Sequence, residues 1–388
     1  MNKIQVLKPK YRTKEILTEI QECLDTSWTG MGGKAIDFEE KWKDYTDFEN
    51  AHFLQSATAG LHLALKVFKE KYGWEDGDEI ITTPLTFVST NHAIMYENLK
   101  PVFADVDDSL CLDPDSILSN ITDKTRAVMF VGIGGNIGQY ERVREICNLQ
   151  NIPLILDAAH LAGTQTMRVY PQYQAMAKSQ VGWDADVSVF SFQAVKNLPT
   201  ADSGMICFKE EKYDKLARQL AWLGIDKDTY SRSDDKGSYK WEYKVPNVGF
   251  KYHGNSIMAS IGLVQLKYLD EDNDYRNQIA TWYDELLENI NDIKTIPLSW
   301  HIHKSSRHLY QILVNEKKRD EIINHLYKNE IYPGVHYVDN TLYPMYSLYS
   351  GTCPRASEYS KQLITLPIHL DITKDDCTKI IETIKEIL

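Results

Sequence analysis

Cysteine is sparse in this chain, and long apolar runs are missing from it. Six of the 388 residues are cysteine, and no two of them lie within three residues of each other. Scattered cysteines in a chain long enough to bury a sizeable core argue against a disulfide scaffold and favour reduced thiols. No apolar stretch approaches the roughly 20 residues of a membrane span. The segment from Met1 to Pro9 also lacks the apolar core of a secretory signal. We therefore expect a cytoplasmic protein without a membrane partner.

The chain also lacks an excess of positive charge. It carries 55 acidic and 43 basic residues, which gives a formal net charge of −12. An acidic balance argues against nucleic acid as a bulk partner, although single basic pockets for phosphate remain compatible with it. With 43% apolar and 25% charged residues the composition is that of a globular protein, which excludes intrinsic disorder. No internal repeat or low-complexity tract is evident.

Short apolar, β-branched runs alternate with helix-like amphipathic stretches. We predict buried strands at residues 80–81, 101–103, 127–131, 153–156 and 187–190. Between several of these runs lie helical patterns, such as those at residues 61–71 and 140–149. Near-continuous apolar strands separated by helices indicate a mainly parallel sheet covered on both faces. The sequence therefore predicts an α/β fold.

The last third of the chain has a different pattern. Residues 270–291 form a long polar-faced helical stretch, and an apolar run at 310–314 precedes helical patterns at 318–329 and 376–388. This order suggests a smaller α+β unit. We predict a large α/β domain over residues 1–269, including the N-terminal segment, and a smaller C-terminal α+β domain over residues 270–388.

Three patterns resemble functional motifs but fit a structural role better. The glycine-rich run from Gly132 to Gly138 fails the dinucleotide-binding register and carries no Walker lysine, so we expect a tight strand-to-helix turn. His301, His303 and His308 have no clustered carboxylate or cysteine, so we expect an exposed histidine face and no metal. The mixed charges of residues 316–321 predict a solvated helix start.

Three other segments carry residues that suit chemistry. Small and hydroxyl residues at 56–60 precede a helical run, where free N–H groups can bind phosphate. Asp157 ends an apolar strand, where ligands bind in open α/β sheets. Lys196 follows another apolar strand, and burial would make its amine a usable nucleophile. Each alone also fits a helix cap, a turn-capping aspartate or a surface lysine. Together they are the parts that pyridoxal phosphate (PLP) requires.

With these segments in place the chain resembles the DegT/DnrJ/EryC1/StrS sugar aminotransferases, a family of fold-type I PLP enzymes. The resemblance runs over nearly the whole chain in the family's order. The matching segments are SATAGLHLAL at 56–65, GDEII at 77–81, PLTFVST at 84–90, DAAH at 157–160, SFQAVK at 191–196, GFKY at 249–252, ASIGL at 259–263 and VHY at 335–337.

The resemblance implies a role for each matching site residue. Lys196 would form the Schiff base with PLP, Asp157 would hold the pyridine nitrogen protonated, and His160 would lie near the ring. Phe87 would stack on that ring. The remaining implied contacts are phosphate binding by Ala57, Thr58, Ser191 and, from a second subunit, Lys251, and sugar binding by His336 and Tyr337. A homodimer with shared active sites follows from the same resemblance.

The chain departs from the family pattern at a few positions. Ala57 replaces a usual glycine, Gly60 a usual alanine and Lys251 a common asparagine. The segments 164–185 and 226–245 are longer than the family pattern implies, and we expect that they help to recognise a nucleotide.

The resemblance implies transfer of an amino group from L-glutamate to a nucleotide-linked keto sugar, with a dTDP-4-keto-6-deoxyhexose as the favoured substrate type. A non-nucleotide ketone, such as a cyclitol or a phosphorylated triose, remains an alternative. Lys196 argues against the related 3-dehydratases, in which a histidine replaces the lysine. The combination of Asp157, His160 and Lys196 argues against a non-catalytic regulator, and the failed glycine register against a Rossmann oxidoreductase.

Overall fold

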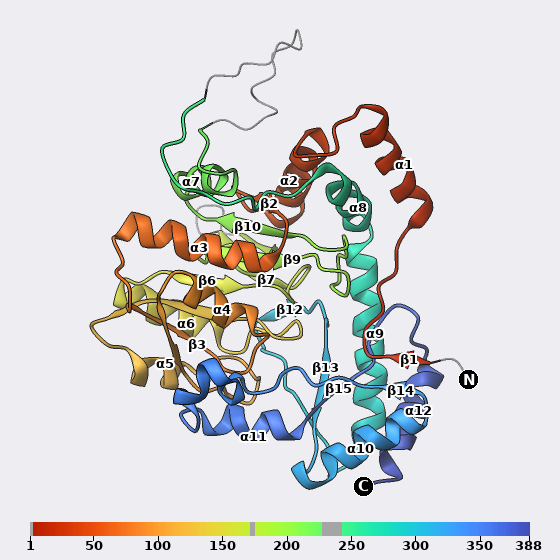
Figure 1. The fold of residues 1–388 in the computed structure, drawn as a ribbon. Coiled ribbons are helices and arrows are strands. Elements are labelled where there is room, and N and C mark those ends of the chain that lie inside the picture. Colours follow the sequence, from red (N-terminus) through yellow and green to blue (C-terminus); the bar gives the residue numbers. More distant parts are fainter. Residues whose placement is uncertain (1–2, 171–174, 227–242) are drawn as a thin grey trace.

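The structure is a computed structural model that describes residues 3–170, 175–226 and 243–388 (Figure 1). Its centre is a seven-stranded sheet of order β2-β10-β9-β6-β5-β3-β4. The strand bounds are β2 His52–Leu54, β3 Glu79–Thr82, β4 Lys100–Phe103, β5 Thr125–Val131, β6 Leu154–Asp157, β9 Val187–Ser191 and β10 Gly204–Phe208. Only β10 runs antiparallel to its neighbours within this sheet. The predicted α/β class and all five predicted strands are confirmed.

Helices cover both faces of this sheet, because alternate strand residues point to opposite sides. Ile155 of β6 belongs to one apolar core with α3 (Ala57–Tyr72) and α7 (Glu211–Ala221). Its neighbours Leu154 and Leu156 belong to the other core with α2 (Gly33–Thr46) and α6 (Tyr140–Gln150). The remaining helices of this part are α1 Thr13–Asp25, α4 Ser89–Tyr96, α5 Pro114–Asn120 and α8 Ser256–Leu266. The helices predicted at 61–71 and 140–149 are confirmed.

The C-terminal part begins with the long helix α9 (Leu269–Leu287), which Figure 1 shows running down one side of the molecule. A three-stranded sheet of order β11-β13-β15 follows. The other bounds are β11 Lys294–Thr295, β13 Tyr310–Leu313, α10 Glu316–Lys328, β14 Ile331–Tyr332, η2 Asn340–Leu342, η3 Pro344–Tyr349, α11 Pro354–Gln362, β15 Leu363–Leu366 and α12 Lys374–Lys385. The elements predicted here are confirmed, including a helix that starts in the charged run at 316–321. The boundary at residue 270 stays a prediction.

Two pairings join segments that are far apart in sequence. The N-terminal strand β1 (Ile4–Gln5) pairs with β14, and Ile4 enters the isoleucine-rich core of the C-terminal part. The long segment at 164–185 forms the hairpin β7 (Gln165–Tyr170) and β8 (Ala175–Gln180). This hairpin pairs with β12 (Ile302–Lys304) in a separate sheet. Most of the other long segment, 226–245, lies outside the described residues.

All six cysteines are buried and unpaired, as the sequence predicts. In the described part of the chain, no helix has the length and apolarity needed to cross a membrane.

Candidate active site

A pocket of about 490 Å³ opens where β6 and β9 end and α3 begins. Nine of the ten predicted site residues line it, and the residue outside is Lys251. The nine are Ala57, Thr58, Phe87, Asp157, His160, Ser191, Lys196, His336 and Tyr337. The carboxyl ends of parallel strands meet at one edge of a sheet, which explains why residues so distant in sequence converge here.

Asp157 is the last residue of β6 and is 4% exposed. Its Oδ2 accepts a hydrogen bond from Thr90 Oγ1 at 2.7 Å, and its Oδ1 accepts from the Ala159 N–H at 3.1 Å. Burial raises the pKa of this carboxyl, while these hydrogen bonds and the charge of Lys196 oppose the rise. A buried carboxylate with spare acceptor capacity suits a cationic partner in the pocket, such as a protonated pyridine nitrogen.

Lys196 lies five residues beyond the end of β9, in a turn that the backbone closes between Lys196 N and Gln193 O. Its side chain lines the pocket. Burial lowers the pKa of its amine to about 8, and the nearby Asp157 carboxylate partly offsets that effect. About one amine in ten is therefore neutral at pH 7, far more than in an ordinary lysine, and the neutral form is the one that acts as nucleophile or proton acceptor.

The N-terminus of α3 forms another part of the pocket wall. Ser56 caps the helix, since its Oγ accepts a hydrogen bond from the Ala59 N–H at 3.1 Å. The N–H groups of Ala57 and Thr58 lie in the first turn, where a helix binds anions. Gly60 lets this helix approach the sheet closely, because a Cβ there would lie 2.7 Å from Val189 Cγ1. The glycine that departs from the family pattern thus has a packing reason.

His160 is held by hydrogen bonds on both ring nitrogens. Its Nδ1 accepts from the Gly134 N–H at 3.2 Å, and its Nε2 lies 3.0 Å from the hydroxyl of Tyr337. Burial and the charge of Lys196 keep the pKa of His160 well below its usual value, so the ring is neutral. A neutral ring that accepts at Nδ1 carries its proton on Nε2 and donates it to Tyr337. The predicted turn at residues 132–138 is confirmed, and it fixes this tautomer.

The prediction that His308 belongs to an exposed histidine face is wrong. His303 is exposed on β12, but His308 is 2% exposed and lines the pocket, with its ring centroid 4.4 Å from that of His160. The chain turns inward after β12 ends at Lys304, so the alternation of that strand does not extend to residue 308. The His308 Nδ1 lies 2.8 Å from Asn197 Oδ1, which ties it to the residue after Lys196. No metal-binding group of histidine, cysteine or acidic residues occurs in the described ranges.

Phe87 lines the pocket and is exposed, whereas Lys251 lies outside it. Phe87 is 58% exposed, and its ring centroid lies 6.1 Å from that of Tyr337, which also lines the pocket. Lys251 does not line the pocket of its own chain, and its Nζ sits 3.3 Å from the centroid of the Trp222 ring.

The donor set of the pocket fits PLP. The buried Asp157 carboxylate suits the pyridine nitrogen of PLP, and the Lys196 amine, with its lowered pKa, suits the aldehyde. The free N–H groups of α3 and the Ser191 hydroxyl suit the phosphate, and the exposed Phe87 ring suits the face of the pyridine ring. The fold and this site together define an α/β enzyme that binds PLP.

Comparison with known proteins gives the family. The DegT/DnrJ/EryC1/StrS aminotransferase family matches residues 10–385. The spore coat polysaccharide biosynthesis protein SpsC of Bacillus subtilis is 32% identical over 386 residues, 97% of this chain and 95% of that protein. The dTDP-4-dehydro-2,3,6-trideoxy-D-glucose 4-aminotransferase of Saccharopolyspora spinosa is 28% identical, with 94% and 92% of the two chains covered. The solved Streptococcus pneumoniae protein Spr1654, in its PLP form, superposes with a TM-score of 0.88 at 27% identity, covering 100% and 98%.

The chain therefore belongs to the DegT/DnrJ/EryC1/StrS aminotransferase family and is a PLP-dependent transaminase.

Proposed function

We propose that the enzyme transfers the amino group of L-glutamate to a keto sugar linked to a nucleoside diphosphate, most favourably a dTDP-4-keto-6-deoxyhexose. The observation that carries the proposal is the pocket that joins Lys196 and Asp157 to His336 and Tyr337 of the C-terminal part. It places a reactive amine and polar groups suited to sugar hydroxyls in one cavity. The names of two relatives, a dTDP-sugar 4-aminotransferase and a polysaccharide biosynthesis protein, support the same substrate class.

The chain's own residues have distinct tasks in this proposal. When bound, PLP supplies an electron sink for the charge that develops at the carbon losing its proton. Lys196 Nζ, in its neutral form, takes that proton and returns it, which a pKa of about 8 allows. The Asp157 carboxylate would stabilise a positive charge on the pyridine nitrogen of bound PLP. Tyr337, which accepts the Nε2 proton of His160, keeps its own hydroxyl proton free to donate to a substrate oxygen.

The proposed active unit is a homodimer in which Lys251 of one chain completes the phosphate site of the other. Lys251 lies outside its own pocket, which supports this arrangement. Co-expression of Lys196→Ala with Lys251→Glu tests it. If the sites are shared, mixed dimers regain one intact site and some activity. If Lys251 serves only its own chain, no chain in the mixture carries both lysines, so neither site is intact and activity stays at the level of the separate variants.

The substrate is tested in two half-reactions on the purified enzyme. L-Glutamate should first bleach the visible PLP band with release of 2-oxoglutarate, and dTDP-4-keto-6-deoxyglucose should then restore the band and yield an amino sugar detectable by mass spectrometry. His336→Ala should slow the second step more than the first. His303→Ala, on the exposed strand β12, serves as the matched control. Restoration by a cyclitol ketone or a triose phosphate, but by no nucleotide sugar, would refute the substrate class.

A further inference from the structure

The side chain of Asn197, the residue after Lys196, is held by hydrogen bonds to residues 76 to 111 positions further along the chain. Asn197 is 6% exposed, and its amide nitrogen donates to Asn273 Oδ1 and to the Ser306 carbonyl, both at 2.6 Å. Its amide oxygen Oδ1 lies 2.8 Å from His308 Nδ1. Both N–H groups and the oxygen of this amide therefore have partners, which is what a buried polar group requires.

These contacts decide which nitrogen of His308 carries the proton. The Asn197 amide cannot be turned over, because its oxygen would then face the Ser306 carbonyl oxygen. An amide oxygen only accepts hydrogen bonds, so His308 Nδ1 must donate to Asn197 Oδ1. Burial keeps the pKa of His308 well below its usual value, so the neutral ring carries its single N–H at Nδ1. His308 therefore holds Asn197 as a hydrogen-bond donor.

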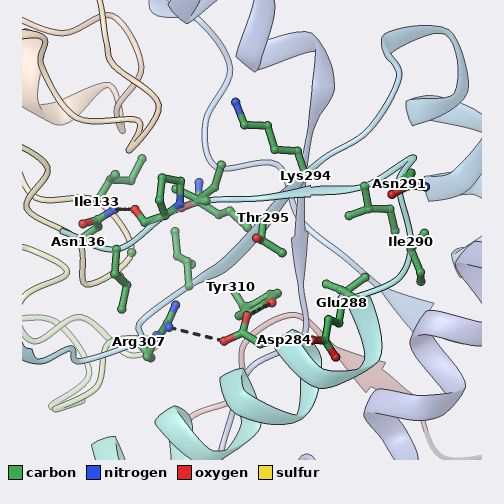
Figure 2. A pocket seen from close by; sticks show the side chains of 18 residues that line it. Ile133, Asn136, Asp284, Glu288, Ile290, Asn291, Lys294, Thr295, Arg307 and Tyr310 are labelled. Atoms are coloured by element: carbon green, nitrogen blue, oxygen red, sulfur yellow. Dashed lines mark hydrogen bonds and ion pairs between the residues drawn. The ribbon is translucent and has the colours of Figure 1, made fainter. Parts of the chain in front are cut away.

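The backbone on both sides of His308 is anchored to α9. Arg307 lines a second cavity, of about 810 Å³, in place of the active-site pocket, and its guanidinium lies 4.0 Å from the Asp284 carboxylate (Figure 2). The Tyr310 hydroxyl donates to the same carboxylate at 2.5 Å. Arg307 also adopts a left-handed backbone (φ 43°), which a residue other than glycine keeps where its surroundings hold it. Since α9 also carries Asn273, one helix supports His308 and a second partner of the same amide.

Lys196 has no comparable support of its own. Its Nζ makes no hydrogen bond or ion pair with any residue in the ranges that the structure describes. A lysine side chain has a flexible stem, so the backbone and the neighbouring residues decide where the amine lies. The turn that carries Lys196 is closed on one side by the backbone hydrogen bond to Gln193 O and is held on the other by the Asn197 side chain. Misplacing a reacting group by about 1 Å can cost about a hundredfold in rate, so the hydrogen bonds of Asn197 bear on the reactivity of Lys196.

We propose that His308 is a positioning residue for Lys196 and acts through the hydrogen bond from its Nδ1 to Asn197 Oδ1. This inference rests on the role proposed for Lys196. The His308 ring lines the pocket, yet the feature that matters is the donor at Nδ1 and not the volume of the ring. Without that donor the turn at Asn197 loses its tie to α9 through His308, and Lys196 Nζ adopts the reacting geometry less often.

Two amide substitutions separate the hydrogen bond from the packing. The amide nitrogen of asparagine, like Nδ1 of histidine, is two bonds from Cβ, so His308→Asn keeps a donor for Asn197. Glutamine fills more of the space of the ring, but its amide nitrogen is three bonds from Cβ, so His308→Gln loses that donor.

The readout is the rate constant for reconstitution of the cofactor-free protein with PLP, measured by stopped-flow absorbance. His308→Asn should stay within about threefold of the wild type, whereas His308→Gln should react on the order of 10–100 times more slowly. His303→Gln, at an exposed position of β12, is the matched control and should react at the wild-type rate. Thermal melts of the cofactor-free proteins report whether each variant is folded.

A double-mutant cycle tests whether His308 acts through Asn197. Asn197→Ala removes the acceptor, so adding His308→Gln to it should slow reconstitution by no more than about twofold. If His308→Gln does not fold, Asn197→Ala removes the same hydrogen bond from its other end and should itself slow reconstitution on the order of tenfold or more.

A faster reaction of His308→Gln than of His308→Asn would give His308 a packing role and overturn the proposal. Effects that multiply in the double variant, or an unchanged rate in Asn197→Ala, would overturn it as well. A failure of the role proposed for Lys196 appears separately, as a visible band that the wild type and Lys196→Ala form at the same rate.

Discussion

The lowered pKa of Lys196 predicts how quickly the cofactor-free enzyme reacts with PLP at each pH. Only the neutral amine attacks an aldehyde. With a pKa of about 8 in place of 10.5, about one amine in ten is neutral at pH 7. That is about three hundred times the neutral fraction of an ordinary lysine at the same pH.

The rate constant for reconstitution with PLP should therefore rise with pH, pass its midpoint near pH 8 and level off above it. Stopped-flow absorbance over pH 6–10.5 measures this profile. The Asp157→Asn variant tests the direction in which Asp157 moves the pKa of Lys196. The Asp157 carboxylate favours the charged ammonium, so its removal should move the midpoint to lower pH. A midpoint near pH 10 in the wild type, or an upward shift in Asp157→Asn, would refute this account of the site's electrostatics.

Three further outcomes follow from the packing and protonation of the site. Without cofactor, Lys196→Met should melt a few degrees above the wild type at pH 7, and the gap should close between pH 8 and 10.5. The reason is that the wild-type folded state binds fewer protons than the unfolded chain in that window, so its stability rises there with pH. Gly204→Ala should lower the unfolding free energy by about 1–3 kcal/mol and weaken PLP binding, because a Cβ there would lie 2.7 Å from the Ala57 nitrogen at the start of α3. Thermal melts and PLP titrations measure both effects. Gly33→Ala is the control, because a Cβ at that position would have no atom within 4 Å. Tyr337→Phe should lower the unfolding free energy by about 1–3 kcal/mol, measured in urea, because His160 Nε2 loses its hydrogen-bond partner. An unchanged midpoint would contradict this hydrogen bond.

Much of the large sheet could be predicted from the sequence, because its strands are buried on both faces. Runs such as residues 127–131 and 153–156 are nearly all apolar, and little other than a covered parallel strand explains them. Asp157 and Lys196 were found for the same reason. Asp157 ends an apolar strand and Lys196 follows one by five residues, and charge is rarely placed there without a partner or a task.

The parts that the sequence did not predict depend on tertiary contacts. Nothing local shows that the chain turns inward between Lys304 and His308, so the burial of His308 was missed. The serines that precede His308 donate hydrogen bonds to residues distant in sequence: Ser305 to the Gly135 carbonyl and Ser306 to the His160 carbonyl. The pairing of β1 with β14 likewise joins the N-terminal segment to residues 331–332 and leaves no periodic signal in either strand.

The central claim is that Lys196 and its pocket carry out PLP-dependent transamination, and one spectrum tests it most directly. The absorbance of the purified holoenzyme should show a visible PLP band that L-glutamate shifts toward the ultraviolet, with one equivalent of 2-oxoglutarate released per active site. In Lys196→Ala the lysine-dependent band and its response to glutamate should both be absent. A holoenzyme without a cofactor band after reconstitution, or an unchanged response in Lys196→Ala, would contradict the account.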